Sequence, residues 1–296
     1  MSEKILVIGA SGFIGENFYS YLKSKKRTVI GTYYKNKKND LFFLDLLNFN
    51  EVLQFIEKYN PSKIFLFSAV STVEECEKNK EYAQKLNIEV PYFIGKICEH
   101  KRICFYFFST DMIFSGKKGT PYVEEDKPSP LSYYGYTKAK AEEKLVDFEC
   151  AKIFRISLNI GRKSPFVKWI KERIKQKKII PLFCDEYRNF TYVMDLSFYL
   201  EKLISMNLSG KIYHLSSKNS ISRCEFGNLF FSHVKKGKEL VKKVYIKDLQ
   251  LNRPTNLTLC VEKIEKESDF KLIDVKESMK NFLIDFQKYE KSIKEG

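Results

Sequence analysis

The first half of this chain alternates between short apolar segments and longer segments with helical periodicity, and this order restricts the possible folds more than any other feature. Predicted strands lie at 4–9, 27–34, 63–69, 102–110 and 151–157, and predicted helices at 13–24, 48–59, 81–100 and 133–148. Parallel strands need long crossover connections, which helices supply. The alternation therefore predicts the α/β class, a Rossmann-type doubly wound parallel sheet with helices on both faces.

The second half of the chain is less regular. Helices are predicted at 165–178, 195–206, 222–234 and 274–294, and a further strand at 211–217 is expected to return to the main sheet. We therefore expect a nucleotide-binding domain over 1–160, to which segments near 188–217 return, and a smaller C-terminal lobe over 161–296 that mainly binds substrate. Pro91 lies inside the predicted helix 81–100 and should kink it, because proline has no backbone N–H to donate.

Three glycines follow the first predicted strand in the sequence GASGFIG, at Gly9, Gly12 and Gly15. Glycine lets a backbone turn tightly and approach a diphosphate closely, and a helix that begins near Phe13 would direct its free N–H groups at the phosphates. The position of this pattern between a strand and a helix indicates dinucleotide binding. The residues predicted to bind the cofactor in this loop are Gly9, Ser11, Gly12, Phe13, Ile14 and Gly15.

The end of the second predicted strand indicates which dinucleotide is bound. A site that prefers NAD usually has an acidic residue there, which accepts a hydrogen bond from the ribose 2′-hydroxyl. This chain instead has Thr32, Tyr33, Tyr34, Lys35, Lys37 and Lys38, with no carboxylate before Asp40. Hydroxyl and ammonium groups suit a 2′-phosphate, so we expect NADP, with NADPH preferred over NADH. Asp45 is expected near the adenine, and the predicted cofactor residues of this region are Thr32, Tyr33, Lys35, Asp45 and Leu46.

A predicted helix carries the pattern YxxxK, formed by Tyr134 and Lys138. Four residues make about one helical turn, so the two side chains share a face. Reduction of a ketone needs a proton donor, and a nearby ammonium lowers the high pKa of a tyrosine by stabilising the phenolate. Open α/β sheets place their chemistry at the carboxyl ends of strands, where Ser109 and Thr110 end the fourth predicted strand. Thr110 is the expected third member, whereas Tyr133 and Tyr136 have no lysine four residues later.

Together these segments resemble the extended short-chain dehydrogenases, and more narrowly the dTDP-4-dehydrorhamnose reductases. The resemblance rests first on GASGFIG, STDMIFSG and SPLSYYGYTKAKAEE. It continues through 188–197, 211–217, 222–227 and 253–264, the last being similar to an RPxNxxL signature formed by Arg253, Pro254, Asn256 and Leu259.

This resemblance implies a function. It implies Thr110, Tyr134 and Lys138 as a catalytic triad for the reduction of the 4-keto group of a nucleotide-linked deoxysugar by NADPH. It also implies that Ser68, Ala69 and Val70 line the cofactor, and that substrate is bound by Ser71, Thr110, Asp111 and Leu158. The chain departs from the family at Ser68–Val70, where Asn-Ala-Ala is usual, and at Leu158, where the rhamnose-type enzymes tend to carry an aromatic residue. Arg162, Lys163 and Lys168 are candidates for the phosphate-binding part of the substrate site.

Three alternative functions share this fold. Sugar-nucleotide 4,6-dehydratases carry Thr-Asp-Glu, and the carboxyl groups carry out the elimination. In this chain Met112 stands in the place of the glutamate, and a methionine side chain cannot transfer a proton. A 4-epimerase would use the same tyrosine and lysine but would hold NAD tightly. A regulatory subunit of methionine adenosyltransferase resembles the same reductases and binds NADP, so the chain could also serve as a partner-binding module without catalysis.

Composition sets the remaining expectations. The formal net charge of +15 suits nucleic acid, an anionic membrane or a phosphorylated small molecule, but no nucleic-acid-binding signature accompanies it and no apolar stretch is long enough to span a bilayer. The seven cysteines are scattered and only three histidines are present, so we expect free thiols in a reducing cytosol and no metal site. The expected partner of this cytoplasmic protein is a nucleotide-sugar substrate, not nucleic acid or membrane, and a homodimer is one candidate assembly.

Overall fold

The computed structural model describes residues 3–295, with side chains through residue 290. The chain divides into two units, which are described separately. Unit 1 comprises the chain up to Phe114, Lys127–Ile156 and Ser197–Tyr213, and unit 2 comprises Ser115–Asp126, Ser157–Leu196 and the chain from His214 onward. The sequence-based division near residue 160 stays a prediction. No helix within residues 3–295 is long and apolar enough to cross a membrane.

Unit 1 is built on a seven-stranded sheet with the order β11-β6-β5-β4-β1-β2-β3. Its strands are β1 (Lys4–Ile8), β2 (Thr28–Tyr33), β3 (Phe42–Phe43), β4 (Lys63–Leu66), β5 (Cys104–Thr110), β6 (Ala151–Ile156) and β11 (Ile212–His214). Strand β1 pairs in parallel with both β2 and β4, and the strand order reverses direction between β1 and β4. The predicted α/β fold is confirmed. Strand β11, which lies within the 211–217 segment, forms one edge of the sheet beside β6.

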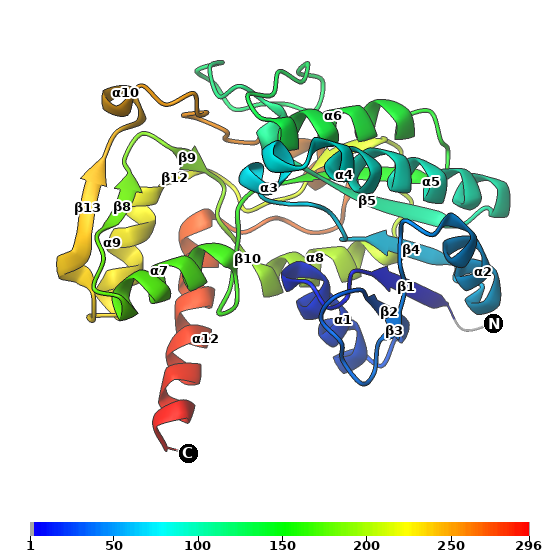
Figure 1. Ribbon diagram of the computed structural model, residues 1–296, viewed down its shortest axis with the longest axis horizontal. Helices are drawn as coiled ribbons and strands as arrows, with labels where there is room; N and C mark the ends of the chain where they lie inside the picture. Colours follow the sequence, from blue (N-terminus) through cyan, green and yellow to red (C-terminus); the bar gives the residue numbers. More distant parts are fainter. Residues whose placement is uncertain (1–2, 296) are drawn as a thin grey trace. The chain divides into compact units, whose positions relative to one another are not determined.

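Strand residues alternate between the two faces of this sheet, as the two-residue repeat of a strand requires. Leu6, Ile64 and Phe105 pack in the core under α2, α5 and α6. On the other face Phe65 stacks on Tyr106 and contacts Phe18 of α1. Figure 1 shows α5 and α6 on one side of the sheet and α1 on the other. The helices of unit 1 are α1 (Phe13–Ser24), α2 (Phe49–Tyr59), α3 (Val73–Lys78), α4 (Lys80–Gln84), α5 (Val90–Lys101), α6 (Tyr133–Leu145) and most of α8 (Val193–Ile204).

The predicted helix 81–100 contains a π-helical turn, η1 (Lys85–Glu89), between α4 and α5. Pro91 follows this turn at the start of α5, where the missing N–H costs least. The structure thus changes helix type just before the proline. The turn contains Asn87, a buried polar residue whose contacts matter for the site.

Unit 2 has small two-stranded sheets packed with helices around an aromatic core. Its elements are β7 (Asn159–Ile160), α7 (Pro165–Lys175), β8 (Ile180–Phe183), β9 (Tyr187–Arg188), β10 (Thr191–Tyr192), β12 (Ile221–Ser222), α9 (Arg223–His233), β13 (Val241–Val244), α10 (Ile246–Leu249), α11 (Glu262–Glu267) and α12 (Val275–Glu295). Phe190, Phe226 and Phe230 stack in sequence, and Phe282 of α12 stacks on Phe230. The short strands pair β10 with β7, β12 with β9 and β13 with β8.

Candidate active site

The glycine-rich loop after β1 has the shape that its sequence predicts. Gly9 has a φ of +85°, which favours glycine, and its carbonyl accepts the Gly12 N–H at 3.0 Å. A Cβ on Gly9 would collide with the backbone of Ser68, and a Cβ on Gly15 would collide with the Gly9 carbonyl. Helix α1 begins after Gly12 without a side-chain cap. The loop therefore packs tightly against the segment that follows β4 and leaves the first N–H groups of α1 for a ligand.

Thr32 and the lysines that follow β2 differ in their surroundings. The Thr32 side chain is buried and its hydroxyl accepts the Gly9 N–H at 3.2 Å, so it fixes the glycine loop to β2. Lys35 and Lys37 are exposed, whereas Lys38 forms an ion pair of 2.8 Å with Glu16 of α1. The ammonium groups of Lys35 and Lys37, which follow β2, are therefore exposed to solvent.

Asn87 joins the loop after β4 to helix α6. Its amide oxygen accepts the Val70 N–H at 2.9 Å, and its amide nitrogen donates to the Val70 carbonyl and to Thr137 Oγ1 at 3.0 Å. Asn87 is 1% exposed, so these bonds form away from water. The predicted cofactor segment Ser68–Val70 is thereby held beside Thr137, the neighbour of Lys138. Sequence reasoning missed Asn87, although a polar residue within an apolar helix is a signal for it.

Thr110 ends β5 and begins the short helix η2 (Asp111–Ile113). Its hydroxyl accepts the Met112 N–H and donates to Asp111 Oδ1, both at 3.2 Å. Ser109 Oγ is buried without a hydrogen-bond partner among the described residues. A Cβ on Gly135 would collide with the Met112 carbonyl, so the start of α6 lies directly against the turn that follows Thr110. Gly135 is a second residue whose role the sequence did not reveal.

The tyrosines of helix α6 differ in their exposure. Ser132 caps the helix by accepting the Gly135 N–H, and Tyr136 is exposed and pairs its ring with that of Tyr133 at 5.5 Å. Tyr134 is half-buried and Lys138, one turn later, is buried. Helix α6, which carries Tyr134 and Lys138, packs on β5 and on η2, the turn that follows Thr110.

Lys138 lies in an apolar environment that perturbs its charge. Its ammonium is 3.9 Å from the centre of the Phe107 ring, and burial lowers the pKa of Lys138 to about 7, against the opposing effect of Glu142 one turn further along α6. Glu142 is itself buried and accepts hydrogen bonds from the Nε and Nη2 of Arg155, at 3.1 and 2.8 Å. Lys138 and Glu142 are thus one turn apart on α6, and the Glu142 carboxylate is paired with the Arg155 guanidinium.

The remaining predicted residues lie in separate places. Asp45 Oδ1 accepts the Leu47 N–H at 3.0 Å, and Leu46 beside it is buried. Ser71 is exposed after the Asn87-bound loop. Leu158 belongs to unit 2, where its carbonyl accepts the Thr191 N–H.

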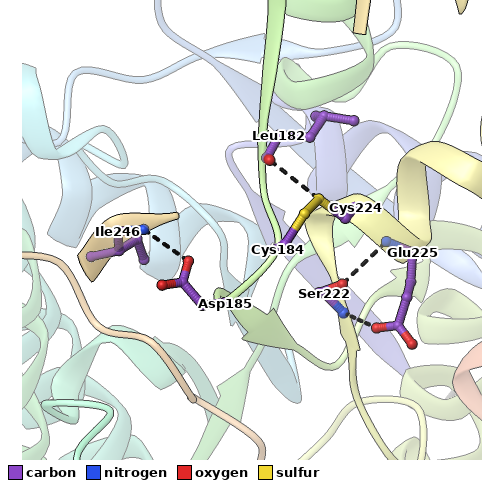
Figure 2. The surroundings of a disulfide bond; sticks show 7 residues. All are labelled: Leu182, Cys184, Asp185, Ser222, Cys224, Glu225 and Ile246. Carbon is purple, nitrogen blue, oxygen red and sulfur yellow. Dashed lines mark hydrogen bonds between the residues drawn. A yellow bond between two sulfur atoms is a disulfide. The ribbon is translucent and has the colours of Figure 1, made fainter. Parts of the chain in front are cut away.

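The expectation that all cysteines are free thiols is wrong for one pair. Cys184 follows β8 and Cys224 lies in the first turn of α9, and the two form a disulfide across 40 residues with their Cα atoms 4.8 Å apart (Figure 2). The sequence could not reveal this pair because the approach depends on the packing of β8 against α9. Cys76, Cys98, Cys104, Cys150 and Cys260 are free.

The seven-stranded sheet and the tight glycine turn after β1 agree with the extended short-chain dehydrogenase/reductase class. Within that class, the chain belongs to the family of the RmlD substrate binding domain, whose match covers residues 3–288.

Individual relatives resemble the chain over most of its length. The dTDP-4-dehydrorhamnose reductase of Aggregatibacter actinomycetemcomitans is 25% identical, over 94% of this chain and 97% of that protein. A probable low-salt glycan biosynthesis reductase, Agl14 of Haloferax volcanii, is 24% identical, over 88% and 91%. Among solved structures, the dTDP-4-dehydrorhamnose reductase of Bacillus anthracis in complex with NADP matches with a TM-score of 0.86 and 24% identity, covering 96% of this chain and all of that one.

Proposed function

We propose that the protein is an NADPH-dependent reductase of the 4-keto group of a nucleotide-linked deoxysugar. The observation that carries the proposal is the buried Lys138 one turn from Tyr134, with the Thr110 hydroxyl at the adjacent strand end. The family match and the reductases among the similar proteins support the same activity.

The residues present fit a dinucleotide. Gly9 and Gly15 keep a close-packed turn free of side chains, and the uncapped start of α1 offers N–H groups to a diphosphate. The order of strands reverses between β1 and β4, which is where open α/β sheets bind nucleotides. NADP is favoured by the absence of an acid after β2 and by the exposed Lys35 and Lys37, and the similar Bacillus anthracis reductase was solved with NADP.

Each residue of the triad has a distinct task in this proposal. When bound, the nicotinamide supplies a hydride to the carbonyl carbon. Tyr134 donates its phenolic proton to the carbonyl oxygen, and the Lys138 ammonium stabilises the phenolate that remains. The Thr110 hydroxyl, which donates to Asp111 Oδ1 in this structure, turns its one proton to the carbonyl oxygen of the substrate and so orients it. Asn87 and Gly135 act indirectly. Asn87 holds the loop after β4, and Gly135 lets the start of α6 lie against the turn after Thr110.

The alternatives make different demands on the chain. A dehydratase needs a second acid where Met112 stands, so this function is not favoured. An epimerase regenerates its cofactor in place, and a regulatory subunit needs no triad. A cytoplasmic location and a homodimeric assembly remain predictions from the sequence.

The proposal is tested by mixing the purified protein with NADPH and a panel of nucleotide-linked 4-ketosugars, and by following loss of NADPH absorbance together with product. We expect consumption of one NADPH for each sugar reduced. If the protein is isolated with firmly bound NAD and interconverts C4 epimers without added cofactor, it is an epimerase. If no member of the panel is reduced and the protein co-purifies with a methionine adenosyltransferase, the regulatory function replaces the proposed one.

A further inference from the structure

Two short segments of unit 2 carry a dense group of lysines. The first, 175–179, contains the end of α7 and the residues after it and has the sequence KQKKI. The second, 235–239, follows α9 and has the sequence KKGKE. The six lysines of these segments are all exposed. We call them the lysine patch, which consists of Lys175, Lys177, Lys178, Lys235, Lys236 and Lys238.

Packing within unit 2 brings the two segments together. Gly237, in the middle of the second segment, has a φ of +88°, and a Cβ there would collide with the side chain of Ile174 in the last turn of α7. Strand β13 follows the second segment and pairs in parallel with β8, which follows the first, so that Val241 lies opposite Ile180. Figure 1 shows the start of β13 next to the end of α7. The six ammonium groups therefore belong to one region of the surface.

The patch has little negative charge to balance it. Within the part of the chain that the structure describes, none of its six lysines pairs with a carboxylate. Glu239 is the one acid in the two segments, and Glu172 on α7 instead accepts a hydrogen bond from Gln176 Nε2 at 2.6 Å. The two segments together carry a net charge of +5. A surface with this excess attracts a partner that presents many negative charges.

An exposed isoleucine lies at the end of the first segment. Ile179 is 56% exposed, the highest value among the exposed large apolar side chains of the described residues. Its carbonyl accepts a hydrogen bond from Arg173 Nη1 at 2.6 Å, which fixes the backbone at this position. An apolar side chain beside lysines suits a partner that has an anionic layer above an apolar one.

The end of α1 in unit 1 provides a contrast, because α1 and α7 end in the same turn. Lys26 and Lys177 have φ values of +57° and +52°, and after each helix two successive N–H groups donate to carbonyls of its last turn. The residue after Lys26 is Arg27, whose guanidinium pairs with Glu201. The residue after Lys177 is Lys178, which pairs with no carboxylate among the described residues. The same turn thus carries compensated charge in unit 1 and uncompensated charge in unit 2.

We propose that the lysine patch docks the protein on an anionic membrane surface, with the ammonium groups at the lipid phosphates and Ile179 in the outer apolar region of the bilayer. Basic residues beside anionic lipids each add to the attraction, and an apolar side chain at the interface adds further to it. Nucleic acid fits less well, since single strands are bound largely by aromatic and arginine side chains and neither segment contains one. The sequence-based expectation of no membrane partner rested on the lack of a spanning segment, which a surface contact does not need.

The test measures partition of the whole protein onto vesicles by sedimentation, without substrate or cofactor. One preparation is phosphatidylcholine alone, and in the other about one lipid in three is phosphatidylglycerol, which supplies the negative charge. We expect binding to the anionic vesicles only. The binding should weaken as salt is added, because salt screens exposed charges.

Two double variants separate the patch from the overall charge of the chain. Lys177→Gln with Lys178→Gln should lower the partition coefficient about 5- to 25-fold, because a lysine near an anionic surface contributes about fivefold. Lys25→Gln with Lys26→Gln removes the same charge at exposed positions of the matching turn after α1, and it should change partition less than about twofold. Thermal unfolding of each variant checks that its fold is retained.

Variants of Ile179 test the apolar part of the contact without a change of charge. Ile179→Ser should weaken partition about three- to tenfold, as expected when a partly inserted apolar side chain is lost. Ile179→Trp should strengthen it, because tryptophan favours the membrane interface. An RNA oligonucleotide has no apolar layer, so its weaker binding should not respond to either change.

Three results would overturn the proposal. Equal partition onto the two vesicle preparations would show that anionic lipid is not recognised, and an equal loss in the two double variants would show that the patch is not the docking surface. An RNA oligonucleotide that binds through Lys177 and Lys178 more tightly than the anionic vesicles, with no effect of Ile179→Ser on vesicle partition, would make the patch a nucleic-acid surface. Because no substrate is present, these results leave the proposed reductase function to its own test.

Discussion

Each unit of the molecule buries a carboxylate beside cations, and the competition between desolvation and charge pairing ends differently in the two places. In unit 1, Glu142 is held by Arg155 and only partly offsets the desolvation of Lys138, whose pKa falls to about 7. In unit 2, Arg223, Arg253 and Arg188 together overcome the desolvation of Glu186 and hold its pKa at about 2. The lysine has one carboxylate to oppose its desolvation, whereas the glutamate has three guanidinium groups.

Lys138 can gain or lose its charge near neutral pH, whereas the arginines around Glu186 keep theirs. A lysine whose pKa lies near neutrality can support proton transfer, since both of its charge states are accessible at working pH. Guanidinium groups stay charged, so the arginines around Glu186 can keep an ion pair but cannot move a proton. We therefore expect changes in unit 1 to alter turnover and changes around Glu186 to alter stability.

The largest effect is expected from Tyr134→Phe, which removes only the phenolic hydroxyl. Turnover should fall by about two to four orders of magnitude, the usual range for a lost general acid, while NADPH binding and the free energy of unfolding stay near those of the unmodified protein. Steady-state kinetics with the accepted 4-ketosugar measure this. Tyr136→Phe is the control, since the exposed Tyr136 lies on the outer face of α6. A normal Tyr134→Phe enzyme beside an inactive Tyr136→Phe enzyme would show that the assigned helix face is wrong.

The second effect concerns stability and comes from Glu186→Gln. This change leaves three arginines without their buried counter-charge, so the free energy of unfolding should fall by about 3–5 kcal/mol. The difference should be complete above the ordinary pKa of 4.5 and should disappear as the pH falls towards the folded pKa of about 2, because Glu186 then becomes protonated in the folded state also. Urea unfolding at several pH values measures it. The exposed Glu172→Gln is the control, and an equal loss in both would contradict the role of burial.

The third effect is on the pH profile and comes from Glu142→Gln. The unmodified enzyme should lose kcat/KM for NADPH as the pH rises above about 7, because the Lys138 ammonium deprotonates there. Glu142 favours that ammonium, so its neutralisation should move the alkaline limb to lower pH, and Glu142→Asp should move it back. Glu143→Gln, on the exposed side of the same helix, should leave the limb in place. A loss of activity that is the same at every pH would mean that Glu142 acts only on folding.

The smallest effect concerns the choice of cofactor. NADPH should bind more tightly than NADH, and changes of Lys35 or Lys37 to Gln should each reduce the preference about two- to fivefold, as expected for exposed charges. Lys38→Gln should matter less, since Lys38 is already paired with Glu16. The preference should shrink at high salt. Equal dissociation constants for NADPH and NADH in the unmodified protein would refute this part of the proposal.

Much of unit 1 could be predicted from the sequence because its signals are local. Helix α1 begins and ends as the pattern after the glycines indicates, and the spacing of Tyr134 and Lys138 fixes their common face, since a helix repeats every 3.6 residues. The class of fold follows from the alternation of strands and helices, whose parallel pairing needs crossovers.

The tertiary structure alone decided which distant residues meet. Asn87 reaches the loop after β4 and Thr137 because its π-helical turn packs against α6. Glu186, Arg223 and Arg253 are separated by dozens of residues and converge through the pairing of β9 with β12 and with the segment after Arg253. The disulfide of Cys184 and Cys224 has the same origin. Periodicity describes neighbours along the chain, whereas these contacts depend on long-range packing, which no local pattern encodes.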